Sequence, residues 1–120
     1  MEIPLYPNGN TLYPADQINI ESVEIQPYPD QFRIRVHIRV TPFSERPNLI
    51  LITRRADGVI VSELNIIETM HHDMEFTLHI RNVENPTGEY TLHTELFYET
   101  RRPPQAEFTK TFIIPDGSSS

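Results

Sequence analysis

Hydrophobic and polar residues alternate along much of this chain. Between residues 32 and 40 every even position is apolar, while the odd positions carry Arg33, Arg35, His37 and Arg39. Successive side chains of a β-strand point to opposite faces. The pattern therefore predicts a strand with one face in a core and the other in water. Residues 75–81 and 90–98 repeat the alternation and predict two more strands of the same kind.

Four further strands are predicted around these three. Residues 18–25 alternate with a slip at Ser22, which indicates a β-bulge. Residues 49–52 and 59–61 are apolar at consecutive positions, so we expect both segments to be covered on both faces. Asp57-Gly58 lies between them and is a signal for a tight hairpin.

The last predicted strand covers residues 107–114. Phe108, Phe112 and Ile114 share one parity, which is typical of a core-facing side. Lys110 has the same parity, and Ile113 has the other. The sequence alone therefore leaves the inner face of this strand unassigned.

Seven strands punctuated by Pro, Asp-Gly and Asn-Pro in about 100 residues predict an all-β, antiparallel sandwich. This spacing and the run Gly88-Glu89-Tyr90-Thr91-Leu92 resemble an immunoglobulin-like domain of the fibronectin type III or macroglobulin kind. The resemblance covers residues 17–115 and implies that Tyr90 forms a tyrosine corner. The chain has neither Cys nor Trp, which excludes an antibody-type domain. Because this fold serves many functions, the resemblance implies no activity.

Three regions are predicted along the chain. Residues 1–16 form an extended, Pro-rich N-terminal arm in which Leu5-Tyr6-Pro7 is echoed by Leu12-Tyr13-Pro14. Residues 17–115 form the β-sandwich, and residues 116–120 form a disordered tail. The arm either lies on its own domain or reaches a partner, including a second copy of the chain.

Composition narrows the classes of function. The chain has 120 residues and a formal net charge of −7, which argues against sequence-blind binding to nucleic acid or to an anionic membrane. The absence of Cys excludes a disulfide scaffold and a thiol nucleophile. We expect no cofactor and a cytoplasmic location, although a mature secreted form whose signal has been removed stays open.

An apolar surplus suggests a contact surface. Because residues 49–52 are all apolar, two of them must face away from the core, and Phe97 has the outward parity of its own strand. Such a patch is normally covered, here by the arm, by a second subunit or by a different protein. We therefore predict a non-catalytic binding or assembly module that homodimerises through this sheet face or binds a partner protein. The predicted contact residues are Ile50, Ile52, Phe97, Tyr6 and Tyr13.

Two rival functions remain. The first is a metal-binding or catalytic domain centred on His71, His72 and Asp73, to which a further His would be added. The second is a carbohydrate-binding module in which exposed aromatic rings stack on sugars, although the chain has no Trp for this purpose. Its candidate aromatic residues are Tyr6, Tyr13, Tyr28 and Phe97.

Two polar features of the predicted sheet are further candidates for functional residues. His37 and His79 face outward on the second and fifth strands and could be cross-strand neighbours. Arg33, Arg35 and Arg39 form a stripe, with successive arginines about 7 Å apart at strand rise. The stripe either contacts an acidic partner or a polyanion, or is neutralised across the sheet by carboxylates such as Glu24 and Glu75.

Overall fold

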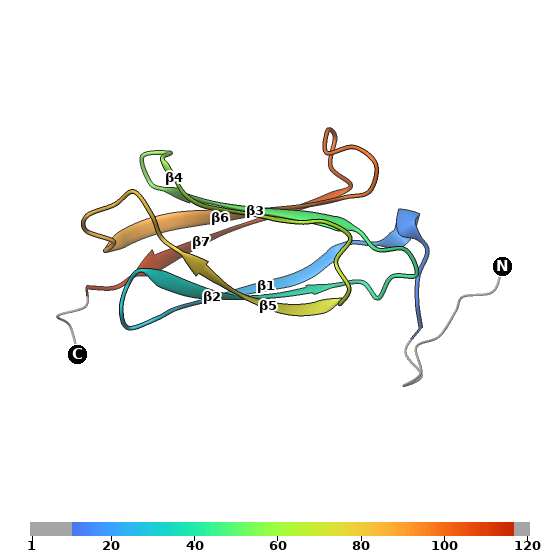
Figure 1. The fold of residues 1–120 in the computed structure, drawn as a ribbon, viewed down its shortest axis with the longest axis horizontal. Helices are drawn as coiled ribbons and strands as arrows, with labels where there is room; N and C mark the ends of the chain where they lie inside the picture. Colours follow the sequence, from blue (N-terminus) through green and yellow to red (C-terminus); the bar gives the residue numbers. More distant parts are fainter. Residues whose placement is uncertain (1–10, 117–120) are drawn as a thin grey trace.

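A computed structural model describes residues 11–116 and shows two antiparallel sheets packed face to face (Figure 1). One sheet has the strand order β1-β2-β5, and the other has the order β4-β3-β6-β7. The elements are a 3-10 helix η1 (Ala15–Gln17) and the strands β1 (Ile20–Pro27), β2 (Arg33–Val40), β3 (Asn48–Arg55), β4 (Ile60–Ile66), β5 (Asp73–His79), β6 (Gly88–Phe97) and β7 (Ala106–Ile114). The predicted seven-stranded sandwich is confirmed.

The strand pairing follows the expected immunoglobulin-like plan, with one distinction. β2 pairs with β5, and β3, β6 and β7 share a sheet, which is the arrangement that the immunoglobulin-like resemblance implies. β4 stays beside β3, whereas the fourth strand of a constant-type immunoglobulin domain joins the opposite sheet. The turn between β3 and β4 explains this pairing locally. Gly58 adopts a φ of 92°, and its N–H donates to the carbonyl of Arg55 at 2.8 Å.

The core lies between the two sheets and is formed by the alternating apolar residues. On β2 the even positions Ile34, Val36, Ile38 and Val40 have no solvent exposure. They face fully buried residues of the other sheet, namely Leu49, Leu51, Leu92 and Leu96. The predicted irregularity in the first strand is also present, as a register shift between Ile20 and Ser22.

The structure assigns the faces of β7. Phe112 and Ile114 are buried and Phe108 packs against the core, so the even positions face inward. Lys110 shares this face, and its Nζ donates to the carbonyl of Val23 on β1 at 3.0 Å. The lysine therefore joins the edges of the two sheets instead of pointing away from the core.

Tyr90 forms the predicted tyrosine corner. Its hydroxyl donates to the carbonyl of Pro86 at 2.7 Å, and the residue is only 1% exposed. The ring stacks on Phe112 with centroids 5.6 Å apart. The corner thus anchors the connection before β6 to the core.

Removing this hydroxyl should destabilise the domain. For Tyr90→Phe we expect a loss of about 1–2 kcal/mol in the free energy of unfolding, because the buried Pro86 carbonyl loses its donor. Urea denaturation measures the loss. Tyr28→Phe is the matched control, since its hydroxyl makes only an exposed 3.5 Å contact with Thr77. Equal losses in the two variants would contradict a special role for the corner.

The described part of the N-terminal arm lies against its own domain. Tyr13 forms an isolated parallel β-bridge with Phe43, and its N–H donates to the carbonyl of Pro42 at 2.8 Å. Its ring packs against the core. Tyr6, the other predicted contact residue of the arm, lies outside the described residues, as do residues 117–120 of the predicted tail. No helix within residues 11–116 is long and apolar enough to cross a membrane.

Candidate functional sites

The outer face of the four-stranded sheet differs from the predicted apolar patch. Ile50 and Ile52 point away from the core, as expected, but they are only 7% and 5% exposed. Their register partners on the two neighbouring strands are polar, namely Asn65, Glu63, Glu95 and His93. The expectation that these isoleucines form an open contact surface is therefore corrected, because polar neighbours flank them on both sides.

Other apolar side chains remain on this face, among them Phe97, Ile113 and Ile60, which lies opposite Arg54 and is 40% exposed. Phe97 is half-buried, and Ile113 is 64% exposed. Phe97 lies at the end of β6, whereas Ile113 lies opposite Glu89 at its start, about 26 Å away at strand rise. They therefore do not form one patch. A contact role for Phe97 stays a prediction.

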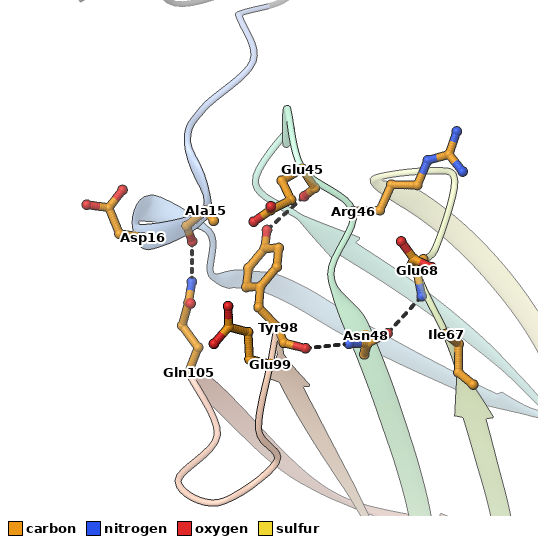
Figure 2. A pocket seen from close by; sticks show the side chains of 10 residues that line it. All are labelled: Ala15, Asp16, Glu45, Arg46, Asn48, Ile67, Glu68, Tyr98, Glu99 and Gln105. Atoms are coloured by element: carbon orange, nitrogen blue, oxygen red, sulfur yellow. Dashed lines mark hydrogen bonds between the residues drawn. The ribbon is translucent and has the colours of Figure 1, made fainter.

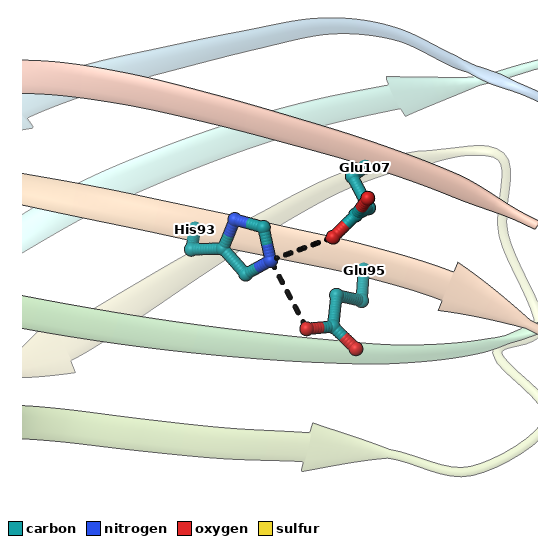
Figure 3. A group of neighbouring side chains, drawn as sticks. All are labelled: His93, Glu95 and Glu107. Atoms are coloured by element: carbon teal, nitrogen blue, oxygen red, sulfur yellow. Dashed lines mark hydrogen bonds and ion pairs between the residues drawn. The ribbon is translucent and has the colours of Figure 1, made fainter. Parts of the chain in front are cut away.

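A charged cluster lies on the same face near the β6–β7 hairpin (Figure 3). Glu95 on β6 is 1% exposed. Its Oε1 accepts from Nε of Arg101 at 3.0 Å, and its Oε2 lies 3.0 Å from Nε2 of His93 and 3.5 Å from Nη1 of Arg102. Oε1 of Glu107 on β7 lies 3.3 Å from the same histidine nitrogen. The two arginines follow β6 in the hairpin to β7, so one connection supplies the cations that balance a buried carboxylate.

The surroundings keep this buried carboxylate ionised. Burial acts to raise the pKa of Glu95, but the hydrogen bond and charge of Arg101, together with His93 and Arg102, hold that pKa below its ordinary value. Nδ1 of His93 lies 2.8 Å from Oγ1 of Thr109, which orients the imidazole. The cluster borders a shallow hollow of about 320 Å³ that also includes Ile52 and Arg54.

Sequence reasoning missed this cluster, although part of the signal was present. His93 and Glu95 share the outward parity of the strand predicted at residues 90–98. Glu107 joins them only through the register of the β6–β7 hairpin, which places it opposite Glu95. Hydrophobic alternation does not specify that register across a long connection.

The arginine stripe on the three-stranded sheet is paired with carboxylates. Arg33 lies 2.7 Å from Asp30. Arg35 lies 3.6 Å from Glu75. Arg39 lies 3.7 Å from Asp73. These exposed ion pairs reduce the positive charge that the stripe offers to a polyanion.

The histidines of this sheet are placed differently from the expectation. His37 lies opposite Glu75, and His79 lies opposite Arg33, so the two histidines are not cross-strand neighbours. Nε2 of His37 instead lies 2.5 Å from Oδ1 of Asp73. The suggestion that His37 and His79 are cross-strand neighbours is therefore wrong, because the residue opposite His37 lies four positions before His79.

The set His71, His72 and Asp73 does not converge as a metal site. Asp73 is engaged by His37 and Arg39. Within residues 11–116, only His93, Glu95 and Glu107 bring three ligand atoms of suitable type within 4.8 Å of one another. The three-ligand geometry that a metal-binding domain requires is therefore found at His93, Glu95 and Glu107 and not at His71, His72 and Asp73.

The Asp73 interaction predicts a pH effect on stability. The hydrogen bond from His37, with a smaller contribution from Arg39, lowers the pKa of Asp73 below its ordinary value of 3.8. A lowered folded-state pKa stabilises the fold above the unfolded-state pKa, and this contribution is lost as the pH falls through the folded-state value. We expect Asp73→Asn to be less stable than the parent in urea at neutral pH and equal to it well below pH 3.8. A difference that persists in acid would contradict this assignment.

A hollow of about 540 Å³ lies at one end of the sandwich (Figure 2). Four segments border it: η1, the β2–β3 connection with the start of β3, the β4–β5 connection and the β6–β7 hairpin. We call it the end groove. Its charged residues are four carboxylates and one guanidinium, Asp16, Glu45, Glu68, Glu99 and Arg46, and its other lining residues are Ala15, Asn48, Ile67, Tyr98 and Gln105.

Hydrogen bonds tie the walls of the end groove together. Nδ2 of Asn48 donates to the carbonyl of Tyr98 at 2.8 Å, while Oδ1 of Asn48 accepts from the N–H of Glu68 at 2.9 Å. The hydroxyl of Tyr98 donates to the carbonyl of Glu45 at 2.9 Å. Nε2 of Gln105 donates to the carbonyl of Ala15 at 2.6 Å. Each wall is therefore connected to a neighbouring wall.

Tyr98 is held in its neutral form at the centre of these contacts. Burial raises the pKa of Tyr98 to about 12, and the nearby Glu45 carboxylate acts in the same direction. Its ring provides an uncharged surface inside an acidic rim, and its hydroxyl is held by the carbonyl of Glu45. No sequence pattern pointed to this groove, because its residues come from connections distant in the chain.

Comparison with known proteins identifies the fold but not a family. No protein-family model matches the sequence, and no curated protein matches it. A solved β-glucuronidase from Bifidobacterium dentium, complexed with coumarin-3-O-glucuronide, matches 81% of this chain with a TM-score of 0.56 and 15% identity. A β-glucuronidase from Lactobacillus rhamnosus matches 94% with a TM-score of 0.55 and 15% identity. A glycosyl hydrolase family 2 member from Bacteroides cellulosilyticus matches 81% with a TM-score of 0.53 and 11% identity.

The chain spans a small part of each of these enzymes. The matches cover 18%, 22% and 15% of the three chains, in the same order. The similarity is therefore to one β-sandwich portion of a larger glycosyl hydrolase. At such low identity it establishes the fold alone.

Proposed function

We propose that this chain is a non-catalytic β-sandwich module that binds a protein partner at the end groove. The observation that carries the proposal is a groove whose walls are fixed by hydrogen bonds through Asn48, Tyr98 and Gln105. A preformed surface loses little conformational entropy on binding. The end of a sandwich is also where immunoglobulin-like domains gather their connections, and connections commonly carry binding residues.

The negative charge of the end groove indicates which kind of partner it would bind. Four carboxylates and one guanidinium line it. Ile67 adds an apolar contact that is 79% exposed at its edge. A basic segment with an aliphatic side chain complements both features, and electrostatic attraction accelerates its association. The partner that we propose is therefore a protein surface or loop carrying arginine or lysine beside an apolar residue.

A carbohydrate-related role is the second candidate, and the three matched glycosyl hydrolases motivate it. A β-sandwich that spans 15–22% of such enzymes fits an accessory role better than a catalytic one. An acidic sugar would be repelled by the carboxylates of the end groove. It would instead favour the hollow beside His93, which is bordered by Arg54, Arg101 and Arg102.

An affinity comparison tests the protein-binding role. The probe is a fluorescein-labelled peptide of alternating arginine and leucine, and the readout is fluorescence anisotropy with the full chain. We expect saturable binding that the double variant Glu68→Gln/Glu99→Gln weakens roughly three- to tenfold, because two charge contacts are lost. Glu24→Gln/Glu89→Gln is the matched control, with the same charge change on exposed strand positions. Equal weakening by both pairs, or no saturable binding, would contradict the proposal.

A further inference from the structure

We propose that His93, Glu95 and Glu107 form a binding site for a divalent transition-metal ion such as Zn²⁺. The site lies on the outer face of the four-stranded sheet (Figure 3) and shares no residue with the lining of the end groove. Two ligands come from β6 and one comes from β7. Imidazole and carboxylate are ligand types that Zn²⁺ and its first-row neighbours accept.

Two of the three distances between the ligand atoms match those around a tetrahedral ion, and all three atoms lie within 4.8 Å of one another. Nε2 of His93 lies 3.0 Å from Oε2 of Glu95 and 3.3 Å from Oε1 of Glu107. In tetrahedral zinc, bonds of about 2.0–2.1 Å place neighbouring ligand atoms about 3.3 Å apart. The two carboxylate oxygens therefore already lie near the distance from Nε2 that a shared ion requires. Three protein ligands leave the fourth position for water or for an anionic group of a second ligand.

A second layer of contacts orients these ligands. Oγ1 of Thr109 lies 2.8 Å from Nδ1 of His93. A hydroxyl can accept as well as donate, so when the ion takes the lone pair of Nε2 the same oxygen can accept a hydrogen bond from a protonated Nδ1. Nε of Arg101 holds Oε1 of Glu95 at 3.0 Å and leaves Oε2 directed at the histidine. Metal-binding histidines and carboxylates usually have such supporting partners.

The arginines compete with the ion only in part. Arg101 contacts Oε1 of Glu95, which is not the oxygen assigned to the metal. Arg102 contacts Oε2 at 3.5 Å, and its side chain is 68% exposed, so it can turn into solvent. On binding, the ion takes the place of the proton that lies between Nε2 of His93 and the two carboxylates. It also displaces the weakly held guanidinium of Arg102. This competition predicts affinity in the micromolar range instead of the tighter binding of a closed structural site.

Titration calorimetry of the untagged full chain with ZnCl₂ tests the proposal. We expect one Zn²⁺ per chain, binding weakened more than tenfold by His93→Gln or Glu107→Gln, and about tenfold weakening by Thr109→Val. His79→Gln and Glu63→Gln are the matched controls, with the same chemical changes at other strand positions, and should bind as the parent does. Circular dichroism in chelator confirms that each variant is folded.

Two results would overturn the metal site. One is the absence of stoichiometric Zn²⁺ binding by the parent chain. The other is binding that survives both His93→Gln and Glu107→Gln but is abolished by His71→Gln/His72→Gln or by a control variant. Neither result bears on peptide binding at the end groove, so the two proposals fail independently.

Discussion

Replacing Ile38 by alanine should cost about 2–5 kcal/mol of the free energy of unfolding. Ile38 has no solvent exposure and lies at the centre of the three-stranded sheet. Its partners across the sheet are Val23 and Met74, which are 2% and 6% exposed. Because both flanks are rigid strands, the cavity left by the lost atoms cannot collapse fully, which places the cost in the range for large-to-small core substitutions.

Urea denaturation followed by circular dichroism measures this loss. Arg39→Ala is the matched control on the adjacent position of β2, where the side chain is 59% exposed and its ion pair with Asp73 spans 3.7 Å. We expect the control to change stability by less than about 1 kcal/mol. Comparable losses in the two variants would contradict the assignment of the even positions of β2 to the core.

Arg101→Ala should be the most destabilising single change outside the core. It leaves the Glu95 carboxylate, which is 1% exposed, without its hydrogen-bonded cation. Removing one partner of a buried ion pair commonly costs 3–5 kcal/mol. We expect about 2–3 kcal/mol here, since His93 and Arg102 still contact the carboxylate.

A double-mutant cycle isolates this interaction. In chelator, Glu95→Gln combined with Arg101→Ala should lose less stability than the sum of the two single changes, because the amide removes the uncompensated charge. Arg102→Ala is the control and should cost less than about 1 kcal/mol, given its 68% exposed side chain. Additive losses, or equal effects of the two arginines, would show that the cluster does not depend on Arg101.

Strand positions and the core could be predicted from the sequence because alternation directly reflects burial. The even positions from Ile34 to Val40 and the corner at Tyr90 behaved as predicted, whereas Phe32 precedes β2 and is 42% exposed. Both features depend on local patterns, namely period-2 hydrophobicity and the offset of a tyrosine from the start of a strand. The pairing of β2 with β5 followed from the immunoglobulin-like resemblance.

Exposure on the outer sheet face was not predictable in the same way. Parity correctly directed Ile52 away from the core, yet its low exposure depends on Glu63 and His93 from two neighbouring strands. The same limit applies to the charged cluster, where Glu107 meets Glu95 only through hairpin register. The end groove needed four connections to converge, and no pattern within one segment encodes such convergence.

The most direct test of binding at the end groove is a ¹H–¹⁵N NMR titration of the full chain. One titration uses the arginine–leucine peptide, and a second uses an oligosaccharide of glucuronic acid. We predict that the peptide shifts the amide signals of Glu68, Tyr98 and Gln105, which line the groove, and leaves Thr109 unchanged. Absence of peptide shifts at the groove, or saccharide shifts confined to His93 and Thr109, would contradict a protein-binding role and favour a carbohydrate-binding one.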